Sequence, residues 1–162
     1  MGDLEARIAA LEGKVRILED ALELQDLMAR YGPAVDSGDA DAAAGLFAED
    51  AVYDAEGVEP MIGADGVRAM VKGPGHQRLL PNSAHTIGPS ALRIRGDQAT
   101  ATGYSRVYLR EGESFRLWRV AANRWEFERR GDEWKVAKRM NRLIGSDDAH
   151  EMLASASVSV SD

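Results

Sequence analysis

Apolar residues near the N-terminus recur with the period of a coiled coil. Their spacings alternate between four and three residues, and charged side chains fill most positions between them. The apolar positions are Leu4, Ile8, Leu11, Val15, Leu18 and Leu22. Leucine at one heptad position and mostly β-branched residues at the other favour a parallel two-stranded pair. The same stripe would also suit a helix packed on its own domain, so residues 1–22 are predicted as a helical extension with both roles open.

The helical pattern continues as far as Tyr31 and then meets Gly32-Pro33. Proline removes a backbone donor, so the sequence predicts that the helix ends or kinks there. A second helix is predicted over residues 40–48, followed by a short strand over 51–54. A third short helix is expected from Asp65 as its cap through Val71.

The second half of the chain reads as long strands. Their predicted ranges are 83–95, 98–110, 114–129 and 134–144, with Gly and Asp residues at the hairpin turns between them. Helices followed by antiparallel strands predict an α+β fold in which the N-terminal helices pack on a strongly curved antiparallel sheet and enclose a pocket. Residues 23–146 form the predicted domain, and residues 147–162 a flexible C-terminal tail.

Composition narrows the possible functions. The net charge is −7, and an acidic surface disfavours general binding to nucleic acid or to an anionic membrane. Cysteine is absent, and the three histidines share no zinc-site spacing, so we expect no metal and no cofactor. No apolar leader or long apolar run is present, which favours a cytoplasmic protein. His76 is expected in an exposed loop and His150 in the tail, and neither receives a role.

Several segments resemble the SnoaL-like branch of the NTF2-like superfamily. They are Tyr31 with Asp36-Ser37-Gly38-Asp39, the run Leu46-Phe47-Ala48-Glu49-Asp50-Ala51-Val52-Tyr53, Ile62-Gly63-Ala64-Asp65-Gly66-Val67, Ala84-His85, and Gly131-Asp132-Glu133-Trp134-Lys135-Val136. The resemblance covers roughly residues 20–145 and implies a cone-shaped fold around a pocket. That fold hosts dehydratases, dehydrochlorinases, isomerases and proteins without catalysis.

The same resemblance implies a three-residue site. Tyr31, Asp36 and His85 are similar in position to residues used by the dehydratases of this superfamily. Bile-acid dehydratases carry an acidic residue on the second long strand, where this chain has Leu109 as the nearest match, so the resemblance does not extend to that substrate.

Chemistry supports an acid–base role for these three residues. Histidine can accept a proton at neutral pH, and a carboxylate on its other nitrogen fixes the tautomer. Tyr31 is predicted to act as the acid, and Arg139 or Arg142 to hold an anion. Further residues expected to contact substrate are Tyr53, Tyr108 and Trp125.

Three functions remain open at this point. The first is a cofactor-independent lyase of the dehydratase kind, or an isomerase, acting on a hydrophobic cyclic molecule. The second is a protein that binds a small ligand without turnover, and the third is an accessory subunit resembling the small subunit of ring-hydroxylating dioxygenases. We expect no nucleic-acid or membrane partner, and a homo-oligomer, dimer or trimer, because the sheet and the N-terminal seam both need covering.

Overall fold

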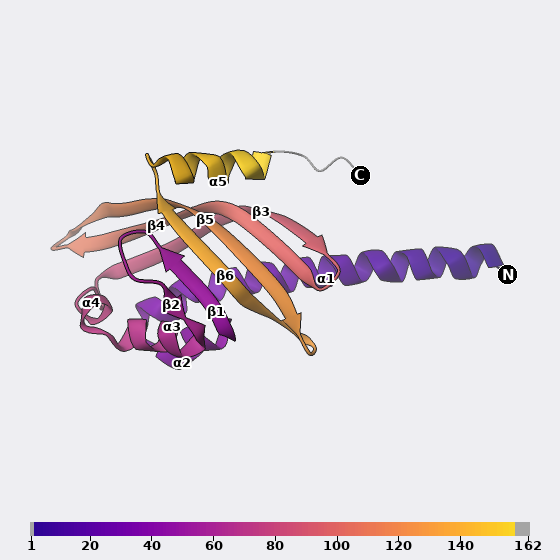
Figure 1. Cartoon of the computed structure of the whole chain (residues 1–162), viewed down its shortest axis with the longest axis horizontal. Helices are drawn as coiled ribbons and strands as arrows, with labels where there is room; N and C mark the ends of the chain where they lie inside the picture. The colour runs from indigo at the N-terminus through magenta and orange to yellow at the C-terminus, as the bar shows by residue number, and fades with distance from the viewer. Residues whose placement is uncertain (1, 158–162) are drawn as a thin grey trace.

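A long N-terminal helix and a six-stranded sheet organise the molecule (Figure 1). The structure, a computed structural model, describes residues 2–157. In chain order its elements are α1 (Gly2–Asp36), α2 (Ala40–Gly45), β1 (Phe47–Ala55), β2 (Met61–Ile62), α3 (Gly63–Lys72), α4 (Pro74–Gln77), β3 (Ser83–Arg95), β4 (Gln98–Glu111), β5 (Ser114–Arg130), β6 (Glu133–Leu143) and α5 (Asp147–Ser157).

The sheet has the strand order β2-β1-β6-β5-β4-β3. Its long strands follow one another through hairpins, as predicted, but β1 lies parallel to β6. The expectation of an all-antiparallel sheet is therefore wrong at this pair, because the chain returns to β1 only after it has laid down β3, β4 and β5. Helices α1 to α4 lie on one face and α5 on the other (Figure 1), which confirms the α+β arrangement.

Helix α1 continues through Pro33 to Asp36 instead of ending at the proline. One proline removes one backbone donor. Against that loss, Leu24, Leu27 and Tyr31 recur at helical spacing and are buried against the sheet. Tertiary packing thus outweighs the local helix-breaking tendency and carries the helix one further turn.

Three other expectations differ from the structure. The predicted helix over 40–48 ends at Gly45, because Phe47 is buried at the start of β1. His76 is not in an exposed loop but buried in α4. Of the predicted tail, residues 147–157 form α5, and residues 158–162 lie outside the described part of the chain.

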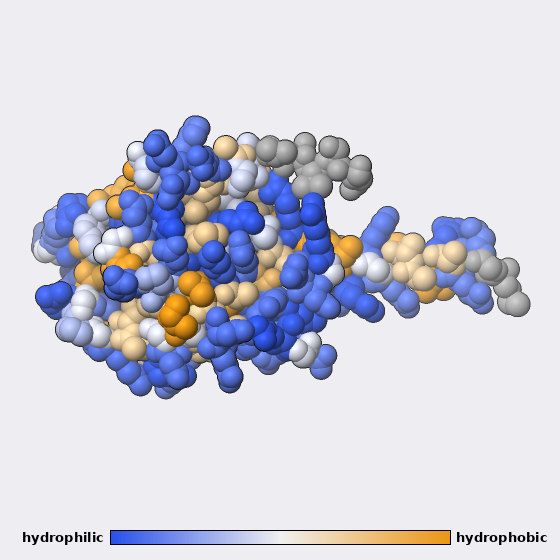
Figure 2. Space-filling view, in the orientation of Figure 1, coloured by the Kyte–Doolittle hydropathy of each residue, from blue (hydrophilic) through white to orange (hydrophobic). Residues whose placement is uncertain are grey.

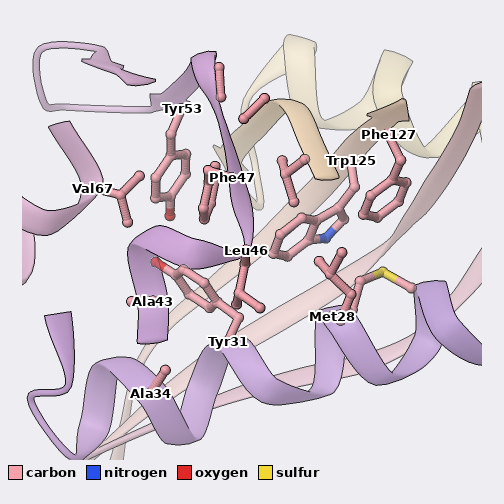
Figure 3. Close-up of a cluster of buried hydrophobic side chains, with 14 of the residues drawn as sticks. Met28, Tyr31, Ala34, Ala43, Leu46, Phe47, Tyr53, Val67, Trp125 and Phe127 are labelled. Carbon is pink, nitrogen blue, oxygen red and sulfur yellow. The ribbon is translucent and has the colours of Figure 1, made fainter. Parts of the chain in front are cut away.

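Aromatic rings dominate the core between α1 and the sheet (Figure 3). The Tyr31 ring lies edge-on to Phe47, Tyr53 and Trp125, with centroid distances of 6.2, 6.3 and 5.8 Å. Trp125 in turn stacks on Phe127 at 6.1 Å. Such offset and edge-on pairs add to the gain from apolar burial, so this cluster fixes where the last turns of α1 lie on the sheet.

One polar contact anchors α1 farther from this cluster. Asp20 is buried and accepts hydrogen bonds from Arg129 Nη2 at 2.5 Å and from Trp134 Nε1 at 3.1 Å. Before this residue, α1 projects beyond the sheet and carries apolar side chains on its surface (Figure 2). None of the helices in residues 2–157 combines the length and apolar character needed to cross a membrane.

Candidate active site

A cavity of about 360 Å³ opens between the helices and the inner face of the sheet. Apolar side chains form much of its wall, including Met61, Met70 and Ile87. Its polar lining residues are Tyr31, Tyr53, His76, His85, Thr86, Ser105, Arg106, Arg119, Arg139 and Asn141. A largely apolar concavity with a few converging polar groups is the usual form of a small-molecule site.

Asp36, the last residue of α1, is bonded to His85 on β3. Its carboxylate accepts hydrogen bonds from His85 Nδ1 at 2.6 Å, from the His85 backbone N–H at 2.6 Å and from Ser83 Oγ at 2.9 Å. Burial by itself raises the pKa of Asp36, but the bonds donated by His85 and Ser83 more than offset it and hold the pKa below its ordinary value. Asp36 is therefore an anion that orients the imidazole.

This contact defines which nitrogen of His85 can react. With Nδ1–H donating to Asp36, the lone pair of the neutral ring is on Nε2. Among residues 2–157, Nε2 has no hydrogen-bond partner, and His85 lines the cavity. The ring of a cavity-lining residue thus keeps one nitrogen free of protein partners.

Gly32 sets the spacing between α1 and β3 at this point. A Cβ on residue 32 would lie 2.1 Å from the backbone carbonyl oxygen of His85. Asp36 follows Gly32 by four residues and so lies on the same side of the helix, one turn on. The glycine lets the helix approach closely enough for the carboxylate to reach His85.

His76 supports the end of the same helix. Its Nε2 donates to the Val35 carbonyl oxygen at 2.7 Å, and its ring centroid lies 5.8 Å from that of His85. A buried polar ring with a satisfied donor ties α4 to α1 and closes one side of the cavity.

Arg139 on β6 is buried beneath the cavity and is only 2% exposed. Its guanidinium carbon lies 4.1 Å, 4.6 Å and 4.0 Å from the ring centroids of Tyr31, Tyr53 and Trp125 respectively. Its Nε and Nη2 donate to Asn123 Oδ1 at 3.1 and 2.9 Å. No carboxylate in the described chain pairs with this cation. Glu126 and Glu128, on the neighbouring strand, pair with Arg124 and Arg130 instead. Cation–π contacts and one amide therefore hold Arg139.

Tyr31 keeps its proton in this environment. Burial, followed by the nearby Tyr53, raises the pKa of the Tyr31 hydroxyl far above its ordinary value, although Arg139 acts in the opposite direction. In Figure 3 the hydroxyl groups of Tyr31 and Tyr53 point toward each other. This environment suits Tyr31 to donate a hydrogen bond while it keeps its proton.

Other polar residues have structural partners. Arg142 is bonded to Asp54 at 2.5 Å and lies 3.5 Å from Asp148, so it is not free to hold a ligand anion. Within residues 2–157, no three His, Asp or Glu side chains gather in a way that could hold a metal ion.

Comparison with known families assigns the fold of this chain. The sequence profile of the SnoaL-like domain matches residues 16–140. The chain belongs to the SnoaL-like family. No functionally curated protein matches it significantly.

Solved structures agree with this assignment. An NTF2-like protein with a cystatin-like fold from Novosphingobium aromaticivorans is 39% identical, with a TM-score of 0.85 over 88% of this chain and 94% of that one. A hexachlorocyclohexane dehydrochlorinase from Novosphingobium barchaimii is 24% identical, with a TM-score of 0.71 over 81% of this chain and 90% of that one. At that identity the dehydrochlorinase shows a shared fold and carries no chemistry across.

The SnoaL-like cavity brings together most of the residues expected from the sequence. Tyr31, Tyr53, His85 and Arg139 line it, and Asp36 holds His85 from behind. Two expected contacts are not on its wall. Tyr108 is not among the residues that line the cavity, although Val107 before it is. Trp125 is fully buried behind Arg139.

Sequence reasoning missed several groups that the SnoaL-like fold places in or beside the cavity. They are Ser83, Ser105, Arg106, Arg119, Asn123 and Asn141, together with His76. Strand alternation in the sequence does place Ser105 and Val107 on one face with Gly103, but it does not show that this face lines a cavity. Nothing in the sequence pattern distinguishes Arg119 from the exposed residues before it.

Proposed function

We propose that this SnoaL-like protein is a small-molecule enzyme that removes a proton from carbon, as a cofactor-independent lyase or isomerase. The observation that supports this most directly is the 2.6 Å contact between Asp36 Oδ1 and His85 Nδ1, made by a histidine that lines the cavity and whose other ring nitrogen is free of protein partners within residues 2–157. A base and its orienting carboxylate at a cavity wall are the minimum needed for proton abstraction.

Each residue has a defined part in the proposed reaction. His85 Nε2 accepts a proton from a carbon of the substrate, and the electrons of the broken C–H bond form a new C=C bond. Asp36 stabilises the imidazolium that results. Tyr31 donates a hydrogen bond to a substrate carbonyl as negative charge builds up on its oxygen.

His85 must pass this proton on before the next turnover. Because burial raises the pKa of Tyr31, Tyr31 is a poor proton donor to a leaving group. We infer that His85 returns the proton it has taken. Delivery to a departing hydroxyl group breaks the C–O bond, releases water and makes the enzyme a dehydratase. Delivery to a different carbon makes it an isomerase.

The cavity favours a hydrophobic cyclic substrate. Its wall offers apolar side chains from α3, β3 and β4, and about 360 Å³ accommodates a small ring system. These features support a substrate with an apolar body and a few polar groups near Tyr31 and His85.

The proposal is tested with a panel of cyclic β-hydroxy ketones and their unsaturated products, incubated with the protein in D₂O. Mass spectrometry follows both loss of water and deuterium uptake at carbon. For a compound that reacts, His85→Ala is expected to lower the rate by roughly 10²–10⁴-fold, the usual contribution of one positioned base, and Asp36→Asn to lower it too.

His150→Ala is the matched control, because His150 is an exposed histidine on α5, outside the cavity lining. Its rate is expected to equal that of the wild-type protein. Retained turnover in both His85→Ala and Asp36→Asn would contradict the proposal. Tight binding of a panel compound with neither water loss nor deuterium uptake would favour the alternative, a protein that binds its ligand without chemistry.

A further inference from the structure

Positive charge is concentrated in the cavity of a protein that is acidic overall. The chain has a net charge of −7, yet the described cavity wall holds Arg106, Arg119 and Arg139 and no aspartate or glutamate. Asp36, the carboxylate nearest in function, is committed to His85 and Ser83. The wall is therefore cationic where the rest of the molecule is not.

Two of these arginines are linked through a pair of asparagines, of which Asn141 lines the cavity. Arg119 Nη2 donates to Asn141 Oδ1 at 2.9 Å, and Arg139 Nη2 donates to Asn123 Oδ1 at 2.9 Å. The two amides face each other across β5 and β6, and Asn141 Nδ2 donates to Asn123 Oδ1 at 3.3 Å. Neutral amides thus hold both guanidinium groups in place without cancelling their charge.

Both arginines also keep buried donors that lack a partner. Within the described chain, Arg139 Nη1 and Arg119 Nε are shielded from solvent and make no hydrogen bond. A buried donor of a charged group is costly to leave unsatisfied. Since both residues line the cavity, a ligand is the natural source of the missing acceptors.

We propose that the substrate carries an anionic group, of the carboxylate kind, that Arg119 and Arg139 bind, while its apolar ring fills the rest of the cavity. The planar guanidinium group matches a carboxylate through paired N–H donors. This proposal rests on the proposed function only in treating the cavity as the substrate site.

The test compares 2-naphthoate with 2-naphthamide, which have similar shape and differ in charge. Isothermal titration calorimetry measures binding of each to the wild-type chain and to His85→Ala, so that binding is separated from turnover. We expect naphthoate to bind at least about tenfold more tightly than naphthamide, as for a hydrogen bond to a charged group.

Arg119→Met and Arg139→Met should each remove that preference, because they weaken naphthoate binding more than naphthamide binding. Arg116→Met is the matched control, because Arg116 is an exposed residue of the same strand, paired with Glu111. If Arg139→Met does not fold, Arg119→Met still decides the matter. Equal affinity for the two compounds, no naphthoate binding at millimolar concentration, or an unchanged preference in Arg119→Met would overturn the proposal. Naphthoate binding that persists in His85→Ala would support the anion site even if no turnover is found.

An independent observation concerns the projecting part of α1. Its six apolar seam residues, Leu4 to Leu22, are between 46% and 67% exposed. The opposite side of the helix faces the domain, where Asp20, Leu24 and Leu27 are buried. The seam is therefore directed away from its own domain. Most of it also precedes residue 16, where the match to the SnoaL-like family begins.

The charged residues beside the seam indicate which partner helix, in which orientation, it can pair with. With Ile8, Val15 and Leu22 at heptad position a, the e positions are Glu5, Glu12 and Glu19, and two of the g positions are Arg7 and Lys14. In a parallel, in-register pair, each g side chain faces the e side chain of the next heptad in the partner. Arg7 then faces Glu12, and Lys14 faces Glu19. An antiparallel pair would place glutamate against glutamate and cation against cation.

We infer that α1 forms a parallel, in-register, two-stranded coiled coil with a second copy of this chain. Mostly β-branched residues at a with leucine at d favour two strands over three. Light scattering on the full chain should give twice the 17.6 kDa mass of one chain. The double variant Leu11→Asp/Leu18→Asp should be monomeric, and Ala6→Asp, at the outward f position, should remain dimeric.

Orientation is tested with single cysteines, since the chain has none of its own. Under mild oxidation Leu4→Cys should form an intermolecular disulfide rapidly, and Ala6→Cys should not, because only the seam position meets its own counterpart in a parallel pair. A wild-type monomer or trimer, a double variant that stays dimeric, or equal cross-linking of the two cysteine variants would overturn the inference.

Discussion

Gly32→Ala places one methyl group where α1 comes closest to β3. The new Cβ would lie 2.1 Å from the carbonyl oxygen and 3.3 Å from the carbonyl carbon of His85, both backbone atoms. Non-bonded heavy atoms are at their best separation near 3.5–4.0 Å. The helix and the strand must therefore move apart by roughly 1 Å or more.

Two effects of opposite sign decide the outcome. Alanine is favoured over glycine inside a helix by about 0.5–1 kcal/mol. Overpacking of a close contact costs about 1–3 kcal/mol. Separation of the two elements also stretches the bonds that join Asp36 to His85, and a hydrogen bond to a charged group contributes about 1.5–3 kcal/mol. Together these contributions lead us to expect that Gly32→Ala lowers the free energy of unfolding by roughly 2–5 kcal/mol.

Gly13→Ala in the same helix is the control, because a Cβ on residue 13 would meet nothing within 4 Å. It should lose no stability and should raise the helical signal. Urea unfolding followed by far-ultraviolet circular dichroism measures both variants, and the imidazole resonances of His85 report the loss of the contact with Asp36. If Gly32→Ala were as stable as the wild-type protein, with those resonances unchanged, the close approach would not be what positions the pair.

Two further predictions concern charged residues of α1. Because the pKa of Asp36 is lower in the folded than in the unfolded chain, the stability that it contributes is present above about pH 4 and is lost as the pH falls through the folded value. Asp36→Asn should therefore lose less unfolding free energy than the wild-type protein between pH 5 and pH 3 in urea titrations, and equal losses would contradict this. Asp20→Ala leaves the buried donors of Arg129 and Trp134 without their acceptor and should lower the free energy of unfolding by about 1–3 kcal/mol. Asp26→Ala, which removes an exposed pair with Arg30, should change it by less than about 1 kcal/mol. Thermal unfolding of both variants tests this difference.

The long strands were predictable because local sequence and fold agree there. The predicted range 83–95 is that of β3, and 98–110 differs from β4 by one residue, since Gly and Asp at the hairpin turns mark the ends. The end of α1 was not predictable from local signals. Pro33 indicates a break, and only burial of Tyr31 and its neighbours against the sheet explains why the helix continues to Asp36.

Some residues of the candidate site could likewise be predicted from the sequence, and others could not. Tyr31, Asp36 and His85 were identified through family resemblance, which encodes a tertiary arrangement in sequence positions. Arg119 follows a run of exposed residues on β5, so its place in the cavity could not be predicted from the sequence. Only the folded sheet brings it within hydrogen-bond distance of Asn141. His76 follows a Gly-Pro-Gly sequence typical of a loop, and its burial depends on the carbonyl of Val35. Long-range partners of this kind leave no periodic trace.

The charged side chains at the cavity form two groups, His85 with Asp36 and Arg119 with Arg139. His85 lies at the C-terminal end of α1, where the Asp36 carboxylate accepts a hydrogen bond from its Nδ1 and orients the ring. Within residues 2–157, Arg119 and Arg139 have no carboxylate partner, and we propose that their charge serves a ligand. A compound that supplies it should stabilise the folded chain by RT ln(1 + [L]/Kd), about 2.7 kcal/mol at a hundredfold excess over Kd. Ligands can therefore be sought by thermal shift among small aromatic and alicyclic carboxylates without knowledge of the reaction, because a carboxylate that accepts hydrogen bonds from Arg119 Nε and Arg139 Nη1 should bind and stabilise the folded chain.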